Sequence, residues 1–269
     1  MPKTLFYLMI NSLLLQVKYK GDIIMIKLIF DDTFEGFLTA IYDAFYSKEE
    51  VAYIGLEDDL DVDMLTKKIH VKTDPIKYTK VKDAIVCKID PLALNKIYHL
   101  FLSNYINKGL ICYKYLKLGF KYGSNIHKHL YLNEVKEVDL INRKVLGEVH
   151  IFTGFVRFSI INDKFLYSSI EPDHNILELL SPHFADRFNN EYWIIHDIKR
   201  NIASIYNKVS WEIAEMNDEI YSYLKNHNDE FEDLWRSYFK SATIKERLNP
   251  KLQRKSIPKR YWNNLTEMQ

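Results

Sequence analysis

The hydrophobic pattern after Met25 predicts a strand followed by a helix. Residues 25–30 are apolar apart from one lysine, which is typical of a buried strand. Asp31-Asp32-Thr33 follows as a turn and helix-capping cluster. Apolar side chains then recur at helical spacing, at Phe34, Phe37, Leu38, Ile41 and Phe45. We therefore expect a helix that lays one face on a core.

Two further helical regions are expected in the middle of the chain. Residues 91–107 carry apolar side chains at helical spacing, and residues 110–145 are lysine-rich with a helical pattern. Residues 48–90 alternate short apolar runs with acidic turns, and their pattern does not specify an element.

The C-terminal half begins with a hairpin signal. Two apolar, β-prone runs, residues 155–161 and 164–170, flank Asn162-Asp163, a two-residue turn. Pro172-Asp173 is expected to cap a helix. The buried stripe of that helix would be Ile176, Leu177, Leu180, Phe184 and Phe188.

A strand and then only helices are predicted for the rest of the chain. Residues 191–197 alternate as a strand. The remainder is expected to be helical, with a core stripe of Phe231, Leu234, Trp235, Tyr238 and Ala242. Asn249 is expected to cap a short helix that begins at Pro250.

Together these elements predict an α+β fold. Its C-terminal half would hold a hairpin–helix–strand unit, flanking helices and a basic helical segment. We place an N-terminal α/β part at residues 25–145 and a motif-rich part at residues 146–269. No proline- or glycine-rich linker separates them, so one continuous domain is the alternative.

Residues 1–24 are interpreted as an extension that precedes the true start of the protein. Their apolar run is broken by Asn11-Ser12 and is too short to span a bilayer. Lys20-Gly21-Asp22 can be encoded by a ribosome-binding sequence, and Met25 follows after a short spacer. The alternative is a genuine extra strand or helix.

Composition narrows the possible chemistry. The net charge of +1 provides no global attraction to nucleic acid, so any attraction must come from local clustering. The only cysteines, Cys87 and Cys112, exclude a disulfide framework and a cysteine-rich zinc or iron–sulfur site. They suit a reducing cytoplasm, and we expect both thiols to be buried.

Positive charge is concentrated near the C-terminus. Residues 236–263 hold nine positive side chains against one negative, Glu246. Arg236, Lys240 and Arg247 share one helical stripe, and arginine suits phosphate. Tyr261 and Trp262 either stack on bases or pack the tail onto the domain. The plainer interpretation is a solvated helix face.

Histidine and carboxylate residues form a second constellation. It consists of His174, His183, His196, Asp197 and Lys199, and such groups bind metals or move protons. Asp173 with Asp197-x-Lys199 also fits a degenerate nuclease-like pattern that could hold Mg²⁺. Helix capping and ion pairing explain the same residues without chemistry. No glycine-rich nucleotide cradle and no serine nucleophile elbow is present.

An ordered set of short motifs resembles a known bacterial family. The motifs are Gly154-Phe155-Val156-Arg157-Phe158, Glu171-Pro172-Asp173-His174-Asn175, His183-Phe184-Ala185-Asp186-Arg187, Trp193-Ile194-Ile195-His196-Asp197-x-Lys199-Arg200, Glu246-Arg247-x-Asn249-Pro250 and Pro258-Lys259-Arg260-Tyr261-Trp262. They resemble the domain of unknown function 4130 family of probable DNA metabolism proteins, from about Met25 to the end. Asp32 departs from the family, where a glycine is expected.

The resemblance implies a cytoplasmic role in DNA repair or modification, with a radical S-adenosylmethionine protein as partner and no membrane association. The phosphate-contacting candidates are Arg157, Arg187, Arg200, Arg236, Lys240, Arg247 and Arg260, with Lys199 and Trp262 beside them. The histidines and Asp197 would line a pocket. No cofactor is expected in this chain, although a metal of unknown identity is possible. The alternatives are an enzyme acting on DNA itself, nuclease-like or glycosylase-like, and a protein-interaction module without DNA contact.

Overall fold

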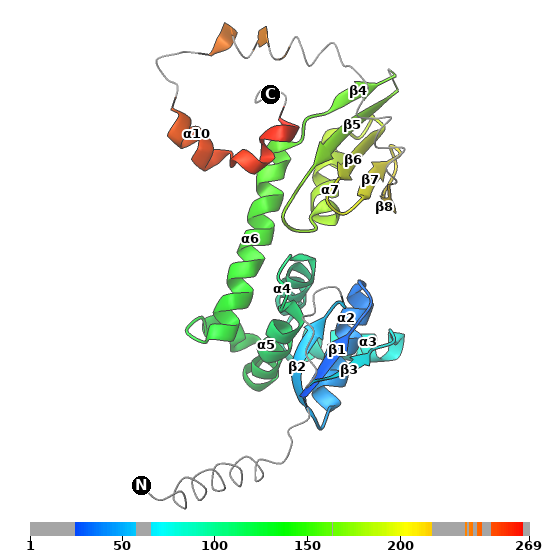
Figure 1. Cartoon of the computed structure of the whole chain (residues 1–269), viewed down its shortest axis with the longest axis vertical. Helices are drawn as coiled ribbons and strands as arrows, with labels where there is room; N and C mark the ends of the chain where they lie inside the picture. The colour runs from blue at the N-terminus through cyan, green and yellow to red at the C-terminus, as the bar shows by residue number, and fades with distance from the viewer. Residues whose placement is uncertain are drawn as a thin grey trace, which may run out of the picture. The chain divides into compact units, whose positions relative to one another are not determined.

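The computed structural model has an α+β fold, as the sequence predicts (Figure 1). It describes residues 25–57, 66–162, 164–216, 235, 237–238, 241–243 and 249–265. Contacts divide the chain into two compact units. Unit 1 runs to Phe101 and includes Tyr105–Leu140, and unit 2 consists of Leu102–Asn104 and the chain from Ile141 onward. In the described part, no helix is both long and apolar enough to cross a bilayer.

Unit 1 is built on a parallel sheet of order β2-β1-β3. The strands are β1 (Met25–Ile29), β2 (Glu50–Gly55) and β3 (Thr66–His70). The strand expected at residues 25–30 is confirmed, and its Ile26 and Leu28 are buried. Parallel neighbours require a crossover, and α2 (Phe34–Tyr46) supplies it between β1 and β2.

The predicted start of α2 is confirmed in detail. Thr33 is its N-cap, and the Thr33 hydroxyl accepts a hydrogen bond from the Gly36 backbone N–H at 3.0 Å. Phe37, Leu38 and Ile41 are buried on the core face. The remaining helices of unit 1 are α3 (Pro75–Lys88), α4 (Pro91–Leu102), α5 (Lys108–Tyr122) and the 3₁₀ helix η1 (Gly123–Lys128). Thus the helix expected over 91–107 ends at Leu102.

The two cysteines have different environments. Cys112 of α5 is buried, and burial raises the pKa of its thiol. Cys87 of α3 is exposed, so the expectation that both thiols are buried is wrong. The reason is helical geometry, because Cys87 is two residues, or about 200°, away from Ile85, which is buried.

Unit 2 contains a five-stranded sheet of order β4-β5-β6-β7-β8. The long helix α6 (Asn133–Phe155) leads into it. Its strands are β4 (Ser159–Ile161), β5 (Phe165–Ile170), β6 (Trp193–Asp197), β7 (Ile202–Tyr206) and β8 (Trp211–Glu215). Only the β5–β6 pair is parallel, and α7 (Leu177–Arg187) forms its crossover. The predicted hairpin is present, with Asn162 at a φ of 52°, but Ile161 pairs with Phe165, so its connection has three residues instead of the two expected, and β4 starts later than expected.

Two predictions for the end of the chain are wrong. Residues 202–206 and 211–215 are strands rather than helix. In the expected aromatic stripe, Trp235 is 42% and Tyr238 61% exposed, while Phe231 and Leu234 lie outside the described residues. The Asn249 cap is confirmed, because its side chain accepts from the Leu252 N–H at the start of α10 (Pro250–Ser256). The 3₁₀ helix η3 (Lys259–Asn264) follows.

Candidate functional site

The candidate site lies at the carboxyl ends of the parallel strands β5 and β6 in unit 2. The loop of residues 171–176 follows β5, and the turn of residues 198–201 follows β6. This edge is where open α/β sheets bind ligands. Three of the motifs found in the sequence contribute residues to it or to the strands that end there.

Glu148 of α6 is the centre of the site. It is only 6% exposed. Its Oε1 accepts hydrogen bonds from the Asp173 N–H and the Tyr261 hydroxyl, both at 2.7 Å, and its Oε2 accepts from the His174 N–H at 2.8 Å. Three donors therefore satisfy a buried carboxylate, which would otherwise be costly to bury.

Glu148 is not among the residues predicted for the site, although the sequence holds a signal for it. The buried residues Ile141, Val145 and Phe152 mark the core stripe of α6. Glu148 falls on the same stripe, at i+3 from Val145 and i−4 from Phe152. An acidic residue at a core position needs a partner, and this rule alone would have marked Glu148 as unusual.

Arg200 holds the loop after β5 to the end of β6. Its guanidinium donates to the Asp197 carboxylate at 2.7 Å and to the backbone carbonyls of Pro172 at 3.2 Å and Asp173 at 2.6 Å. The Asp197 side chain is fully buried, and this burial raises its pKa, an effect that the Arg200 charge opposes. The Arg200 guanidinium therefore donates hydrogen bonds to groups of the protein itself, whereas the sequence predicts that it contacts phosphate.

Arg260 and Tyr261 attach η3 to the same loop. Arg260 pairs with the Asp173 carboxylate at 2.8 Å and donates to the Tyr261 hydroxyl at 2.9 Å. Tyr261 is buried and its ring packs against Phe152. Burial, together with Glu148, raises the pKa of the Tyr261 phenol. The prediction that Tyr261 packs, which left stacking on bases as the alternative, agrees with this position.

We call this set the Glu148 network: Glu148, Asp173, His174, Asp197, Arg200, Arg260 and Tyr261. It joins the loop after β5, the turn after β6, α6 and η3. Asp173 is not the N-cap of α7 as expected, because Ile176 occupies that position without a side-chain hydrogen bond. Asp173 instead uses its carboxylate on Arg260.

The three candidate histidines have different environments. His174 is buried, and its Nδ1 accepts from the Asn104 N–H at 3.3 Å. His196 is fully buried with its Nδ1 3.1 Å from the Tyr167 hydroxyl. Burial lowers the pKa of both imidazoles, and for His174 the charges of Glu148 and Asp173 act in the opposite direction.

His183 is separate from this pair, on the exposed face of α7. Within the described ranges, no group of three or more His, Cys, Asp or Glu side chains could hold a metal ion. The Lys199 side chain is exposed, while its backbone N–H donates to Asp197 at 3.1 Å. The structure therefore brings His174 and Asp197 into one network and leaves His183 and the Lys199 side chain at the surface.

The other candidates for nucleic-acid contact differ in the exposure of their side chains. Arg187 is exposed beside the Phe188 ring, whereas Arg157 donates to the Gly154 carbonyl at 2.6 Å. Trp262 is half-buried and its Nε1 donates to the Ile257 carbonyl at 2.9 Å. Arg236, Lys240 and Arg247 lie outside the described residues.

A basic surface covers α10 and η3. Residues 249–265 contain five positive side chains and no acidic one, and all five are exposed. Arg260 is one of them and pairs with Asp173. We define the other four as the C-terminal basic surface: Lys251, Arg254, Lys255 and Lys259.

Comparison with known proteins identifies the family. No curated protein and no solved structure matches the chain. The model of the domain of unknown function DUF4130 matches residues 107–267, which is more than half of the chain and includes all of the Glu148 network. The chain therefore belongs to the DUF4130 family.

Proposed function

We propose that this protein is a DNA-handling subunit in bacterial DNA repair or modification, and that it contacts the DNA backbone through the C-terminal basic surface. The observation that carries the proposal is the segregation of charge. The whole chain has a net charge of only +1, yet residues 249–265 hold five exposed positive side chains and no negative one. Such segregation concentrates positive potential on one surface, which attracts phosphate.

The Glu148 network gives this surface a fixed support. Tyr261 and Arg260 of η3 bond to Glu148 and Asp173, so the basic segment is tied to unit 2 at one end. Preorganised positive groups lose less conformational entropy on binding than the same groups on a free tail. In the proposal, Arg200 and Arg260 position the segment while the lysines and Arg254 meet phosphate.

The same network favours binding over phosphodiester hydrolysis at Asp173 and Asp197. Each carboxylate is paired with an arginine, at 2.8 Å for Asp173 and 2.7 Å for Asp197. A nuclease of the kind considered above would need these two carboxylates to be available for a metal ion. We therefore assign the chemistry of the proposed system to a partner.

That partner is proposed to be a radical S-adenosylmethionine protein. The support is the family resemblance, together with the cysteine count. Two cysteines are too few to hold an iron–sulfur cluster by the usual four thiolates. A pull-down from the native host, with and without nuclease treatment, tests the partnership. Recovery of such a protein in both samples supports it, and recovery of none contradicts it.

Direct DNA contact is tested by a salt titration of binding to duplex DNA. We expect weak dependence on base sequence, because phosphate contacts carry no sequence information. The triple variant K251A/R254A/K255A should lower the slope of log affinity against log salt by about two to three, at up to roughly 0.9 per phosphate contact. Its folding should be unchanged, because the three side chains are exposed.

A matched control removes the same charge elsewhere. Lys128, Lys136 and Lys164 are also exposed and lie outside the C-terminal basic surface. K128A/K136A/K164A should therefore leave the salt slope within error of the wild type. If the wild-type protein binds no DNA at low salt, alone or with its partner, the proposal of direct contact fails and the interaction-module interpretation replaces it.

A further inference from the structure

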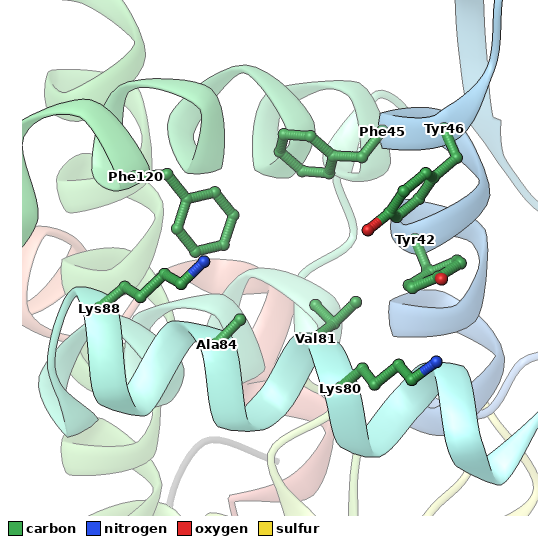
Figure 2. Close-up of a pocket in the computed structure, with 8 residues that line it drawn as sticks. All are labelled: Tyr42, Phe45, Tyr46, Lys80, Val81, Ala84, Lys88 and Phe120. Atoms are coloured by element: carbon green, nitrogen blue, oxygen red, sulfur yellow. The ribbon is translucent and has the colours of Figure 1, made fainter.

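Unit 1 contains a hollow that the proposed function does not use. It lies among α2, α3 and α5 and has a volume of about 420 Å³, within the usual size range of small-molecule sites. Its lining is Tyr42, Phe45, Tyr46, Lys80, Val81, Ala84, Lys88 and Phe120 (Figure 2). Half of these residues are aromatic, two are lysines and none is acidic.

The aromatic side chains form the walls of the hollow. Figure 2 shows three of them on α2 and Phe120 on the facing helix α5, with the small side chains Val81 and Ala84 of α3 between. The Phe45 and Phe120 ring centroids are 5.6 Å apart, while Tyr46 is 73% exposed. A large exposed aromatic beside a hollow offers a stacking face for a flat ring.

The two lysines mark opposite ends of the hollow. Figure 2 shows the Lys80 ammonium beside Tyr42 and the Lys88 ammonium beside Phe120. Their positions along α3 are eight residues apart, which corresponds to about 12 Å at 1.5 Å per residue. Each ammonium lies near the outer limit of a cation–π contact, at 5.9 Å from the Tyr42 centroid and 6.0 Å from the Phe120 centroid.

Within the described ranges, no acidic neighbour neutralises either of these charges. Lys77, one turn before Lys80, is paired with Asp43 at 2.6 Å. Among the residues that the structure describes, no acidic side chain pairs with Lys80 or Lys88. Two unpaired positive charges at the ends of an aromatic hollow are complementary to an anion that carries a flat apolar ring.

We propose that this hollow binds a nucleotide, with the base stacked on the aromatic wall and the phosphate at Lys80 or Lys88. The nucleotide is either free or a unit of single-stranded DNA. The proposal does not rest on the proposed function, because the hollow belongs to unit 1 and the C-terminal basic surface to unit 2. A small carboxylate without a ring would pair with a lysine but not stack on the aromatic wall, and a neutral aromatic compound would stack but not pair with a lysine.

Calorimetric titration of the full chain at low salt tests the site with four probes: thymidine monophosphate, thymidine, inorganic phosphate and a thymidine hexanucleotide. We expect the monophosphate or the hexanucleotide to bind more tightly than thymidine or phosphate alone. K80A/K88A should weaken that binding about tenfold, because the charge-assisted contact to the phosphate is lost whichever lysine makes it. Y46A should also weaken it about tenfold through lost stacking.

The control variant is K72A/K82A, which removes two exposed lysines of unit 1 that do not line the hollow. It should bind as the wild type does, and so should K251A/R254A/K255A. Binding of the hexanucleotide but not of the monophosphate identifies single-stranded DNA as the source of the nucleotide, and the reverse identifies a free nucleotide. Equal losses in K80A/K88A and K72A/K82A, or no binding tighter than that of phosphate, overturn the proposal.

Discussion

At the scale of single residues, the sequence motifs of unit 2 are partners of one another. Asp173, His174, Asp197 and Arg260 each invite a separate chemical role when read along the chain. In the fold they meet in the Glu148 network, where Arg200 pairs with Asp197 and Arg260 pairs with Asp173. Their pairing could not be predicted from spacing, because Glu148 and Tyr261 are 113 residues apart and neither carries a motif that names the other.

Replacement of Glu148 by Gln should destabilise unit 2 by about 1–3 kcal/mol. Gln retains one acceptor oxygen, but its amide NH₂ then faces a backbone N–H or the Tyr261 hydroxyl, and a buried donor loses its acceptor. Y261F removes one donor and should cost about 1 kcal/mol. Urea unfolding followed by tryptophan emission measures both variants.

The control for this experiment is Glu212→Gln, at an exposed position on β8. Its stability should stay within about 0.5 kcal/mol of the wild type. A wild-type midpoint for E148Q would mean that Glu148 is not an essential acceptor and that the network does not support η3.

At the scale of secondary-structure elements, local patterns were predictable and sheet neighbours were not. The α2 cap, the β4–β5 hairpin and the Asn249 cap depend on residues within a few positions of each other. The strand β7 lacks a strong alternation because Ala203 and Ser204, both small, are buried. The two side chains lie on opposite faces of the sheet: Ala203 packs in a core cluster with Tyr167, while Ser204 faces α7 and accepts a hydrogen bond from the Ser181 hydroxyl at 2.6 Å. This packing hides the strand from a search for large apolar residues.

Two glycines test how closely the elements pack. A Cβ at Gly109, in the first turn of α5, would overlap the backbone carbonyl oxygen of Ile54 on β2. Backbone cannot move aside cheaply, so G109A should destabilise unit 1 by about 1–3 kcal/mol. Gly147, inside α6, has nothing near its Cβ position, and G147A should stabilise the helix by about 0.5–1 kcal/mol.

Hydrogen exchange at the β1 and β2 amides, and at the α6 amides, measures the two glycine effects separately. Faster exchange in the sheet of unit 1 is expected for G109A, and slower exchange in α6 for G147A. Unchanged exchange in G109A would show that β2 and α5 can move apart at no cost, against the close approach seen here.

At the scale of the whole molecule, the two units differ in their aromatic residues, and therefore in the fluorescence that reports their folding. All four tryptophans, Trp193, Trp211, Trp235 and Trp262, belong to unit 2. Tryptophan emission therefore follows the folding of unit 2, while the aromatic hollow of unit 1 contains only tyrosine and phenylalanine. The α+β class was predictable from the sequence. The hollow was not, because its aromatic and lysine side chains come from α2, α3 and α5, whose faces meet only after folding.

The buried histidines make the stability of unit 2 depend on pH. Burial lowers the pKa of His174 and His196, so the folded state binds protons less readily than the unfolded state. The stabilisation is therefore full above the unfolded value of about 6.5 and is lost as pH falls through and below it, by at most about 1.4 kcal/mol per pH unit for each imidazole.

The urea midpoint from tryptophan emission should decrease as the pH is lowered from 7.5 to 5.5. H174N and H196N keep an acceptor near Nδ1 and should each reduce this fall, whereas replacement of the exposed His183 by Asn should not. Burial raises the pKa of Asp197, so above pH 3.8 this carboxyl makes the free energy of unfolding fall as pH rises, which is opposite to the effect of the histidines. If the midpoint depends on pH equally in all three histidine variants, the pH dependence comes from other groups.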